Sequence, residues 1–258
     1  KLPEAVLFCQ TFARKGYVVA SIQYRLGCDL PINKDNMLKA VIRALQDARG
    51  AIQYFRWNAA QGGNTFKIDP TQVYIAGYSA GAITALHLAY LDKASEFQQI
   101  APLSLLNSMG GINSSSGSHH NYPWKVNGVI TFAGALGKAT WMEPGDPPLI
   151  SMHGTEDHIV PFNTGEPIMG VLNPPLYMDG SRVIDSVAAT VGVCDDLWAI
   201  RGRDHVVFYT SPDIALKCMD FITPRLCAMR YNIPFCCANF NATAFANSSE
   251  VCKGESTQ

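Results

Sequence analysis

Residues 73–81 read VYIAGYSAG, and this stretch decides the fold. Its first four residues are apolar or β-branched and predict a short buried strand, while residues 80–91 predict the helix that follows. The Gly-x-Ser-x-Gly pattern therefore lies on a sharp turn between a strand and a helix, which lifts the serine hydroxyl out of the sheet. We expect both glycines to be needed for steric reasons, and Ser79 to be a nucleophile.

Strands and helices alternate along the rest of the chain. Further strands are expected at residues 18–22, 126–132, 147–152 and 197–200, and further helices at residues 37–55, 181–191 and 214–222. Asp35 or Asn36 is expected to be the N-cap of the helix that follows it. The polar, Gly/Ser-rich residues 107–121 predict a surface loop. This alternation is typical of an α/β fold with a doubly wound, mostly parallel sheet flanked by helices.

The 258 residues suit a single domain. We expect residues 1–231 to form it and residues 232–258 to form an irregular, Cys-rich tail.

A serine hydroxyl needs a base to become a good nucleophile, and His205 is the best of six histidines. It lies in a loop after the last expected strand, where a distant partner of a strand-end serine can reach it. His87 is expected to be packed or at the surface of its helix. His119 and His120 are expected to be exposed in the Gly/Ser-rich loop.

Asp157 follows the strand at residues 147–152 and is the expected acid that orients the base. It gives the chain order Ser, Asp, His, which is one of the orders known for such triads. Glu156 and Asp204 remain alternatives. With Asp157 in this role, His153 is expected to pack the loop.

These motifs together resemble the carboxylesterase and lipase branch of the α/β-hydrolases, particularly esterases of small acyl groups, including those that deacylate plant polysaccharides. The resemblance extends to about Pro224 and also rests on residues 24–26, 46–48, 58–59, 69–70, 160–161 and 202–205. It implies a serine hydrolase that cleaves carboxylic esters, small or polysaccharide-linked, through an acyl-enzyme on Ser79. The Ala80 N–H would form half of the oxyanion hole, and Tyr78, Trp141 and Ile159 are candidates for binding the substrate.

One departure from the family concerns the second oxyanion donor. The family places a His-Gly loop before the strand expected at residues 18–22, and the residues ahead of Val18 contain no His-Gly. We therefore expect the N-terminal strands and this donor to lie outside the sequence. Loss of one such donor typically costs a factor of about 10²–10³ in rate. Two other functions stay open, a serine peptidase of the same fold and a noncatalytic hydrolase-like binding protein.

Composition limits the partners and the compartment. The net charge of −1, with no dense basic stretch, gives no indication of nucleic-acid binding. The apolar runs are shorter than the roughly 18 residues that span a bilayer. Eight cysteines and the sequons at Asn113, Asn241 and Asn247 predict a secreted, glycosylated protein with disulfides of open pairing. No Cys-x-x-Cys spacing suggests a metal, and the expected chemistry needs no cofactor.

Overall fold

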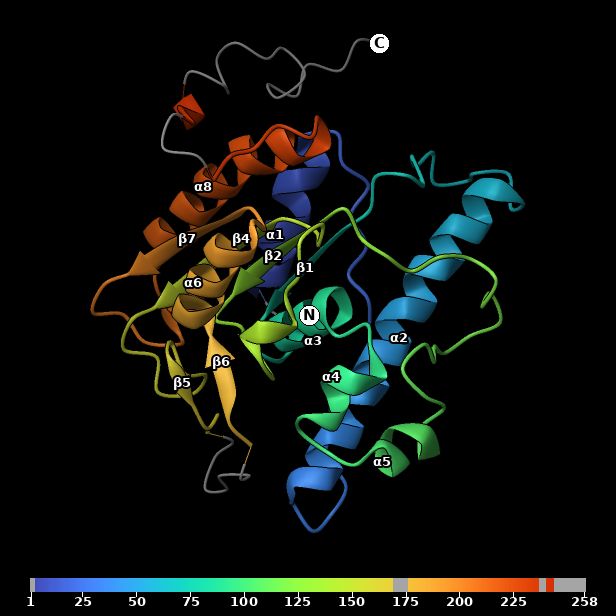
Figure 1. The fold of residues 1–258 in the computed structure, drawn as a ribbon. Helices are drawn as coiled ribbons and strands as arrows, with labels where there is room; N and C mark the ends of the chain where they lie inside the picture. Colours follow the sequence, from blue (N-terminus) through green and yellow to red (C-terminus); the bar gives the residue numbers. More distant parts are fainter. Residues whose placement is uncertain (1–2, 169–175, 237–239, 244–258) are drawn as a thin grey trace.

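A parallel four-stranded sheet forms the centre of the computed structural model, which describes residues 3–168, 176–236 and 240–243 (Figure 1). Its strands lie in the order β1-β2-β4-β7 and are β1 (Tyr74–Tyr78), β2 (Gly128–Phe132), β4 (Leu149–Gly154) and β7 (Asp195–Ile200). Because all four run in the same direction, their carboxyl ends meet at one edge of the sheet. The loops after them are therefore neighbours in space.

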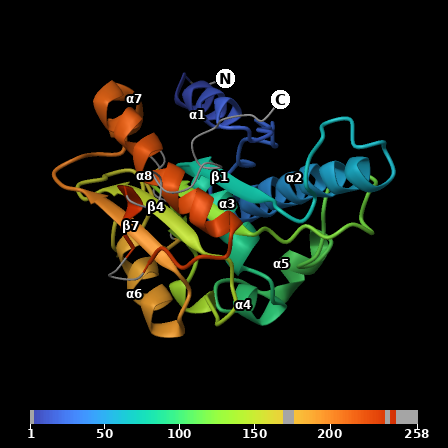
Figure 2. The same cartoon turned by 90° about the horizontal axis from the view of Figure 1, so that it is seen from above.

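Each face of the sheet carries its own hydrophobic core. Val129 and Leu149 point into one core, while Ile130 and Ile150 point into the other, as the period of two of a strand requires. Helices α2 (Lys34–Ala60), α3 (Ala80–Tyr90) and α6 (Ser181–Val191) supply the first core. Helices α1 (Pro3–Arg14), α7 (Val207–Thr210) and α8 (Pro212–Arg230) supply the second. Figure 2 shows α1 and α8 on one side of the sheet and α6 on the other, which confirms the predicted doubly wound α/β fold.

Short elements complete the fold and were not expected from the sequence. They are the antiparallel sheet β3-β6-β5, made of β3 (Ala135–Leu136), β6 (Met178–Gly180) and β5 (Thr164–Gly165), the helices α4 (Ala94–Gln98) and α5 (Leu103–Ser108), and the 3₁₀ turn at Ala139–Trp141. Strands and turns of two or three residues, and helices of five or six residues, are too short to show a period.

The strand predicted at residues 18–22 is wrong. This segment has no strand structure, and Val18 and Ile22 are 54% and 39% exposed. Within the described ranges, β1 pairs with β2 alone and no strand pairs with residues 18–22. An apolar, β-branched run becomes a strand only where such a neighbour exists. The helix α1 that precedes it was not expected either.

The N-cap of α2 is Asn33, so the expectation of Asp35 or Asn36 is also wrong. Asn33 has extended backbone with φ −148°, and its side chain accepts the backbone N–H of Asn36 at 2.9 Å. The helix thus begins almost one turn before the apolar pattern that predicted it. A cap residue satisfies an N–H group inside the first turn, so it lies upstream of the first buried side chain.

The described part of the C-terminal tail is fastened to the domain. Phe235 is 2% exposed in the second core, and Cys236 forms a disulfide with Cys194, just before β7. Cys9, Cys28 and Cys218 are free thiols. Cys237, Cys252 and the sequon at Asn247 lie outside the described residues. In the part of the chain that the structure covers, no helix has the length and apolar character needed to cross a bilayer.

Candidate active site

Ser79 occupies the turn between β1 and α3 that the sequence predicted. Its backbone has φ +55° and ψ −119°, a conformation that a non-glycine residue adopts at a cost of about 1–3 kcal/mol. The N–H of Ser79 donates to the Phe132 carbonyl at 2.9 Å, which fixes the turn to β2. Ala80 opens α3, and N–H groups in a first helical turn have no acceptor inside the helix.

The two glycines of the turn have different roles. A side chain at Gly77 would begin 2.1 Å from the backbone oxygen of Gly81, so only glycine fits there, as expected. The same expectation for Gly81 is wrong. Outside its own helix backbone and its chain neighbours, the nearest atom to a side chain at Gly81 would be the Tyr24 hydroxyl oxygen, at an ordinary contact distance of 3.8 Å. The turn bends over Gly77 and leaves the Gly81 side open.

Ser79, His205 and Asp157 come from three loops at the carboxyl edge of the sheet and form one hydrogen-bonded chain. Ser79 Oγ lies 2.9 Å from His205 Nε2, and His205 Nδ1 lies 2.7 Å from Asp157 Oδ2. Asp157 and His205 are buried, so this chain is shielded from water on the acid side. The arrangement can take a proton from the Ser79 hydroxyl and stabilise the resulting imidazolium.

Asp157 is held as a carboxylate by several donors. Its Oδ1 accepts the backbone N–H groups of Ile159 and Val160, both at 2.8 Å. Burial alone would raise the pKa of Asp157, but hydrogen bonds from His153, His205 and Val160 together hold that pKa well below its usual range. The carboxylate therefore stays charged at neutral pH.

The alternative acids do not reach the imidazole of His205. Asp204 Oδ1 accepts two backbone N–H groups, that of His205 at 2.6 Å and that of His158 at 3.1 Å. Glu156 is fixed through its backbone N–H, which donates to the Arg203 carbonyl at 3.0 Å. Asp204 thus stabilises the loop that carries His205, while Asp157 is the acid that bonds to the imidazole ring.

Tyr78 packs against the histidine. Its ring stacks on His205 with the centroids 5.2 Å apart and an angle of 29° between the planes, and its hydroxyl donates to the His205 carbonyl at 3.1 Å. This contact buttresses the imidazole on the face of the ring. The structure therefore places Tyr78, expected to bind substrate, beside the base.

The other two residues expected to bind substrate differ in their exposure. Ile159 is 38% exposed and lies two residues after Asp157, at the rim of the site. Trp141 is 1% exposed in the first core, and its indole N–H donates to the Gln99 side chain. Trp141 is not available to a substrate, because its large apolar ring is used to fill the core.

His153 contacts the acid, which the sequence did not indicate. It lies on β4 with its side chain fully buried, and it packs the following loop as expected, in contact with the Val160 carbonyl oxygen and the Phe162 ring. Its Nε2 is 3.1 Å from Asp157 Oδ2. The available signal was its spacing of four residues before Asp157 at a strand end, but spacing alone does not tell which way a side chain points.

The remaining histidines lie apart from this chain of bonds. His87 is buried within α3, where burial lowers its pKa to about 4 and Nδ1 lies 2.8 Å from the Ile83 carbonyl oxygen. His119 stacks on Trp57 with centroids 4.2 Å apart. Among the described residues, no group of three or more His, Cys, Asp or Glu side chains is placed to hold a metal ion.

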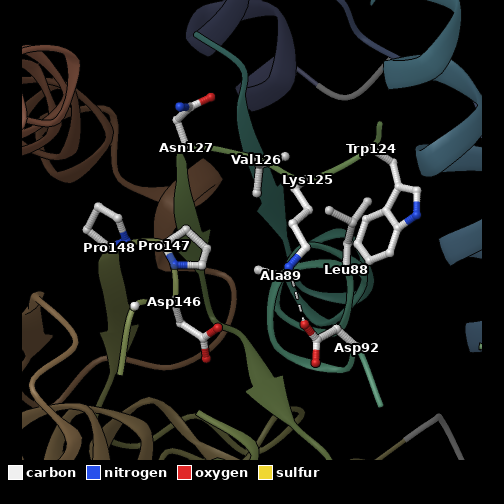
Figure 3. A pocket seen from close by; sticks show the side chains of 11 residues that line it. Leu88, Ala89, Asp92, Trp124, Lys125, Val126, Asn127, Asp146, Pro147 and Pro148 are labelled. Atoms are coloured by element: carbon white, nitrogen blue, oxygen red, sulfur yellow. Dashed lines mark ion pairs between the residues drawn. The ribbon is translucent and has the colours of Figure 1, made fainter. Parts of the chain in front are cut away.

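A cavity of about 260 Å³ lies at the other edge of the sheet (Figure 3). Asn127 and Pro148, which line it, directly precede β2 and β4, so it opens at the amino ends of the strands. Trp124 forms one wall, and Lys125 and Asp92 pair across it at 3.6 Å. Its position separates this cavity from Ser79, which follows the carboxyl end of β1.

The fold and this chain of three residues define an α/β-hydrolase. A family model named BD-FAE matches residues 4–137, more than half of the chain, and the chain belongs to that family. The match includes the turn at Ser79 and ends before Asp157 and His205.

Solved structures of an esterase have the same fold. Esterase 2 of Thermogutta terrifontis phosphoramylated by tabun superposes with a TM-score of 0.60 at 20% identity, covering 86% of this chain and 75% of that one. Its propionate-bound form gives a TM-score of 0.59 at 20% identity, covering 86% and 76%. A search of curated proteins gave no match.

Proposed function

We propose that this protein is a serine esterase that hydrolyses carboxylic esters through an acyl-enzyme on Ser79. The observation that carries the proposal is the unbroken hydrogen-bonded chain from Ser79 Oγ through both nitrogens of His205 to Asp157, at 2.9 and 2.7 Å. Within this chain Ser79 is the nucleophile, His205 the general base and Asp157 the group that orients the ring.

The two half-reactions follow from this geometry. Ser79 Oγ attacks the ester carbonyl while His205 Nε2 takes its proton, and Asp157 stabilises the imidazolium. The Ala80 N–H, free at the start of α3, donates to the developing oxyanion. His205 then gives the proton to the leaving alkoxide, and a water molecule activated by the same nitrogen releases the acid from Ser79.

We also propose that the protein acts on esters of short acyl groups and that it is secreted. Propionate- and butyrate-bound forms of the similar Thermogutta esterase support a short acyl chain. The Cys194–Cys236 disulfide and the exposed sequon residues Asn113 and Asn241 support an oxidising, glycosylating compartment. The natural ester is then a small molecule or an acyl group on a polysaccharide outside the cell.

Hydrolysis of p-nitrophenyl acetate, butyrate and palmitate by the purified protein tests the function. We expect turnover of the two short esters, and a loss of about 10⁴-fold or more in Ser79→Ala, because a triad without its nucleophile keeps little activity. Ser186→Ala is the matched control, since Ser186 is exposed on α6 and bonds only within its own helix.

Equal rates for the wild type and Ser79→Ala would contradict the proposal. Labelling by a fluorophosphonate separates the remaining functions. A wild type that neither turns over esters nor reacts at Ser79 is a noncatalytic protein, and one that reacts but cleaves only peptides is a peptidase.

A further inference from the structure

His153 makes a buried set of polar contacts directly behind Asp157. Its Nε2 lies 3.1 Å from Asp157 Oδ2 and 3.2 Å from the Val160 carbonyl oxygen, and its Nδ1 lies 2.8 Å from Ser181 Oγ. The side chains of His153 and Asp157 are both fully buried. Polar groups with so many contacts in a core are strongly constrained in orientation.

These contacts determine where the proton of His153 lies. The carboxylate of Asp157 and the carbonyl of Val160 can only accept hydrogen bonds, so Nε2 carries the hydrogen. In a neutral ring Nδ1 then accepts, and Ser181 is its donor. The other acceptor near Ser181, the Gly134 carbonyl, is farther away at 3.4 Å.

Asp157 Oδ2 thus receives two imidazole N–H donors, one from His153 and one from His205, while its Oδ1 receives two backbone N–H groups. Every additional donor lowers the negative charge that the oxygen presents to its other partners. Without the His153 donor, Oδ2 would attract the proton on His205 Nδ1 more strongly and would favour the charged form of His205.

We infer that His153 is a positioning residue that shares Asp157 Oδ2 with His205 and thereby sets the pH above which His205 can act as a base. The inference rests on the proposed function, since it assigns a role to His153 within that same chain of residues. It predicts a pH effect, which a residue that only fills space would not produce.

Other polar and titratable groups also lie around His205. Ser79 lies at Nε2, and Tyr78 stacks on the ring. Asp204 binds the His205 backbone N–H and that of His158. None of these is bonded to His153, so a change in the titration of His205 on substitution of His153 reports on Asp157.

Two amide substitutions test the inference as a matched pair. In His153→Gln the side-chain nitrogen can reach the position of the imidazole Nε2 and donate to Asp157. In His153→Asn the shorter amide ends near the position of Nδ1 and faces Ser181. Both introduce a neutral amide, so they differ chiefly in whether Asp157 Oδ2 keeps its second donor.

We expect the acidic limb of the kcat/KM profile on p-nitrophenyl butyrate to move up by about one pH unit in His153→Asn, the scale of one hydrogen bond to a charged group. His153→Gln is expected to stay within about 0.3 units of the wild type. The NMR titration of the His205 Cε1–H signal should show the same difference, and it requires no turnover.

If His205 titrated with the wild-type midpoint in both variants, the inference would be overturned. In the wild type, two-bond nitrogen–proton NMR spectra should place the His153 hydrogen on Nε2, and a hydrogen on Nδ1 alone would overturn the inference even if a variant failed to fold. If the wild type hydrolysed no ester, the proposed function would fail, while both NMR measurements would still decide whether His153 donates to Asp157 and shifts His205.

Discussion

The carboxyl edge of the sheet and the N-terminal segment of residues 15–33 are held in place differently, the first by paired strands and the second by side-chain contacts. At the carboxyl edge, parallel strands bring Ser79, Asp157 and His205 together, although 126 residues separate the first from the last. Residues 18–22 are as apolar as a strand but have no neighbouring strand in the described part of the chain, and the side chain of Arg25 bonds the segment to α2. Parallel topology therefore fixes where loops meet, whereas composition does not fix whether a segment pairs.

The largest effect should come from the carboxyl edge, where Asp157→Asn is expected to lower kcat on a short-chain ester by about 10⁴-fold. An amide has the same shape but cannot hold His205 with its hydrogen on Nδ1. Asp204→Asn is the control, because its remaining carbonyl oxygen can still accept the backbone N–H groups that Asp204 binds. We expect Asp204→Asn to keep kcat within about threefold, and a loss as large as that of Asp157→Asn would give the loop the role now assigned to the acid.

The sequence predicted the central strands because each is a short apolar run bounded by turn signals, and it predicted the helices α2, α3, α6 and α8 from their apolar patterns. It also predicted which three residues would meet, because strand ends can be recognised in the sequence and the carboxyl ends of parallel strands lie at one edge of the sheet. Ser79 at a strand–helix turn and Asp157 after a buried strand are of this kind.

What the sequence did not predict depends on contacts between distant residues. Whether residues 18–22 pair and whether Trp141 faces a substrate or the core are each decided by a partner elsewhere in the chain, and the orientation of the His153 ring depends on the distant Ser181 as well as on Asp157. Gly81 is a similar case, because its need for glycine depends on which atoms surround it.

A smaller effect, on stability, should distinguish the two glycines of the Ser79 turn. Gly77→Ala forces a methyl group to within 2.1 Å of a backbone oxygen, and we expect it to destabilise the protein by about 2–4 kcal/mol. Gly81→Ala should change stability by no more than about 1 kcal/mol, since alanine favours a helix and meets no close atom. Thermal unfolding should show a Tm lowered by roughly 5–15 °C for the first variant and little changed for the second. Equal losses would mean that the turn is constrained at both glycines, as the sequence alone suggested.

The smallest effect should come from the N-terminal segment. Asp47 accepts the backbone N–H of Arg25 at 2.8 Å and pairs with its guanidinium, whose side chain is half exposed. Burial alone would raise the pKa of Asp47, but the bonds from Arg25 lower it, so this contact persists above pH 4 and is lost as the pH falls through the lowered pKa. An exposed pair of this kind contributes at most about 1 kcal/mol to global stability.

Asp47→Ala, which removes the acceptor altogether, should therefore leave the Tm within about 3 °C of the wild type but should speed hydrogen exchange at the Arg25 amide by about tenfold at neutral pH. Asp29→Ala is the control, since it removes the pair of Asp29 with Arg43 and leaves the bonds between Arg25 and Asp47 in place. If the Arg25 amide stayed protected in Asp47→Ala, a backbone partner would have to hold the segment. Residues 15–33 would then resemble the paired strands of the sheet, and the contrast between the two regions would not stand. Faster exchange confined to this segment would instead show that the Asp47 side chain protects the Arg25 amide, as backbone hydrogen bonds protect the amides of the paired strands.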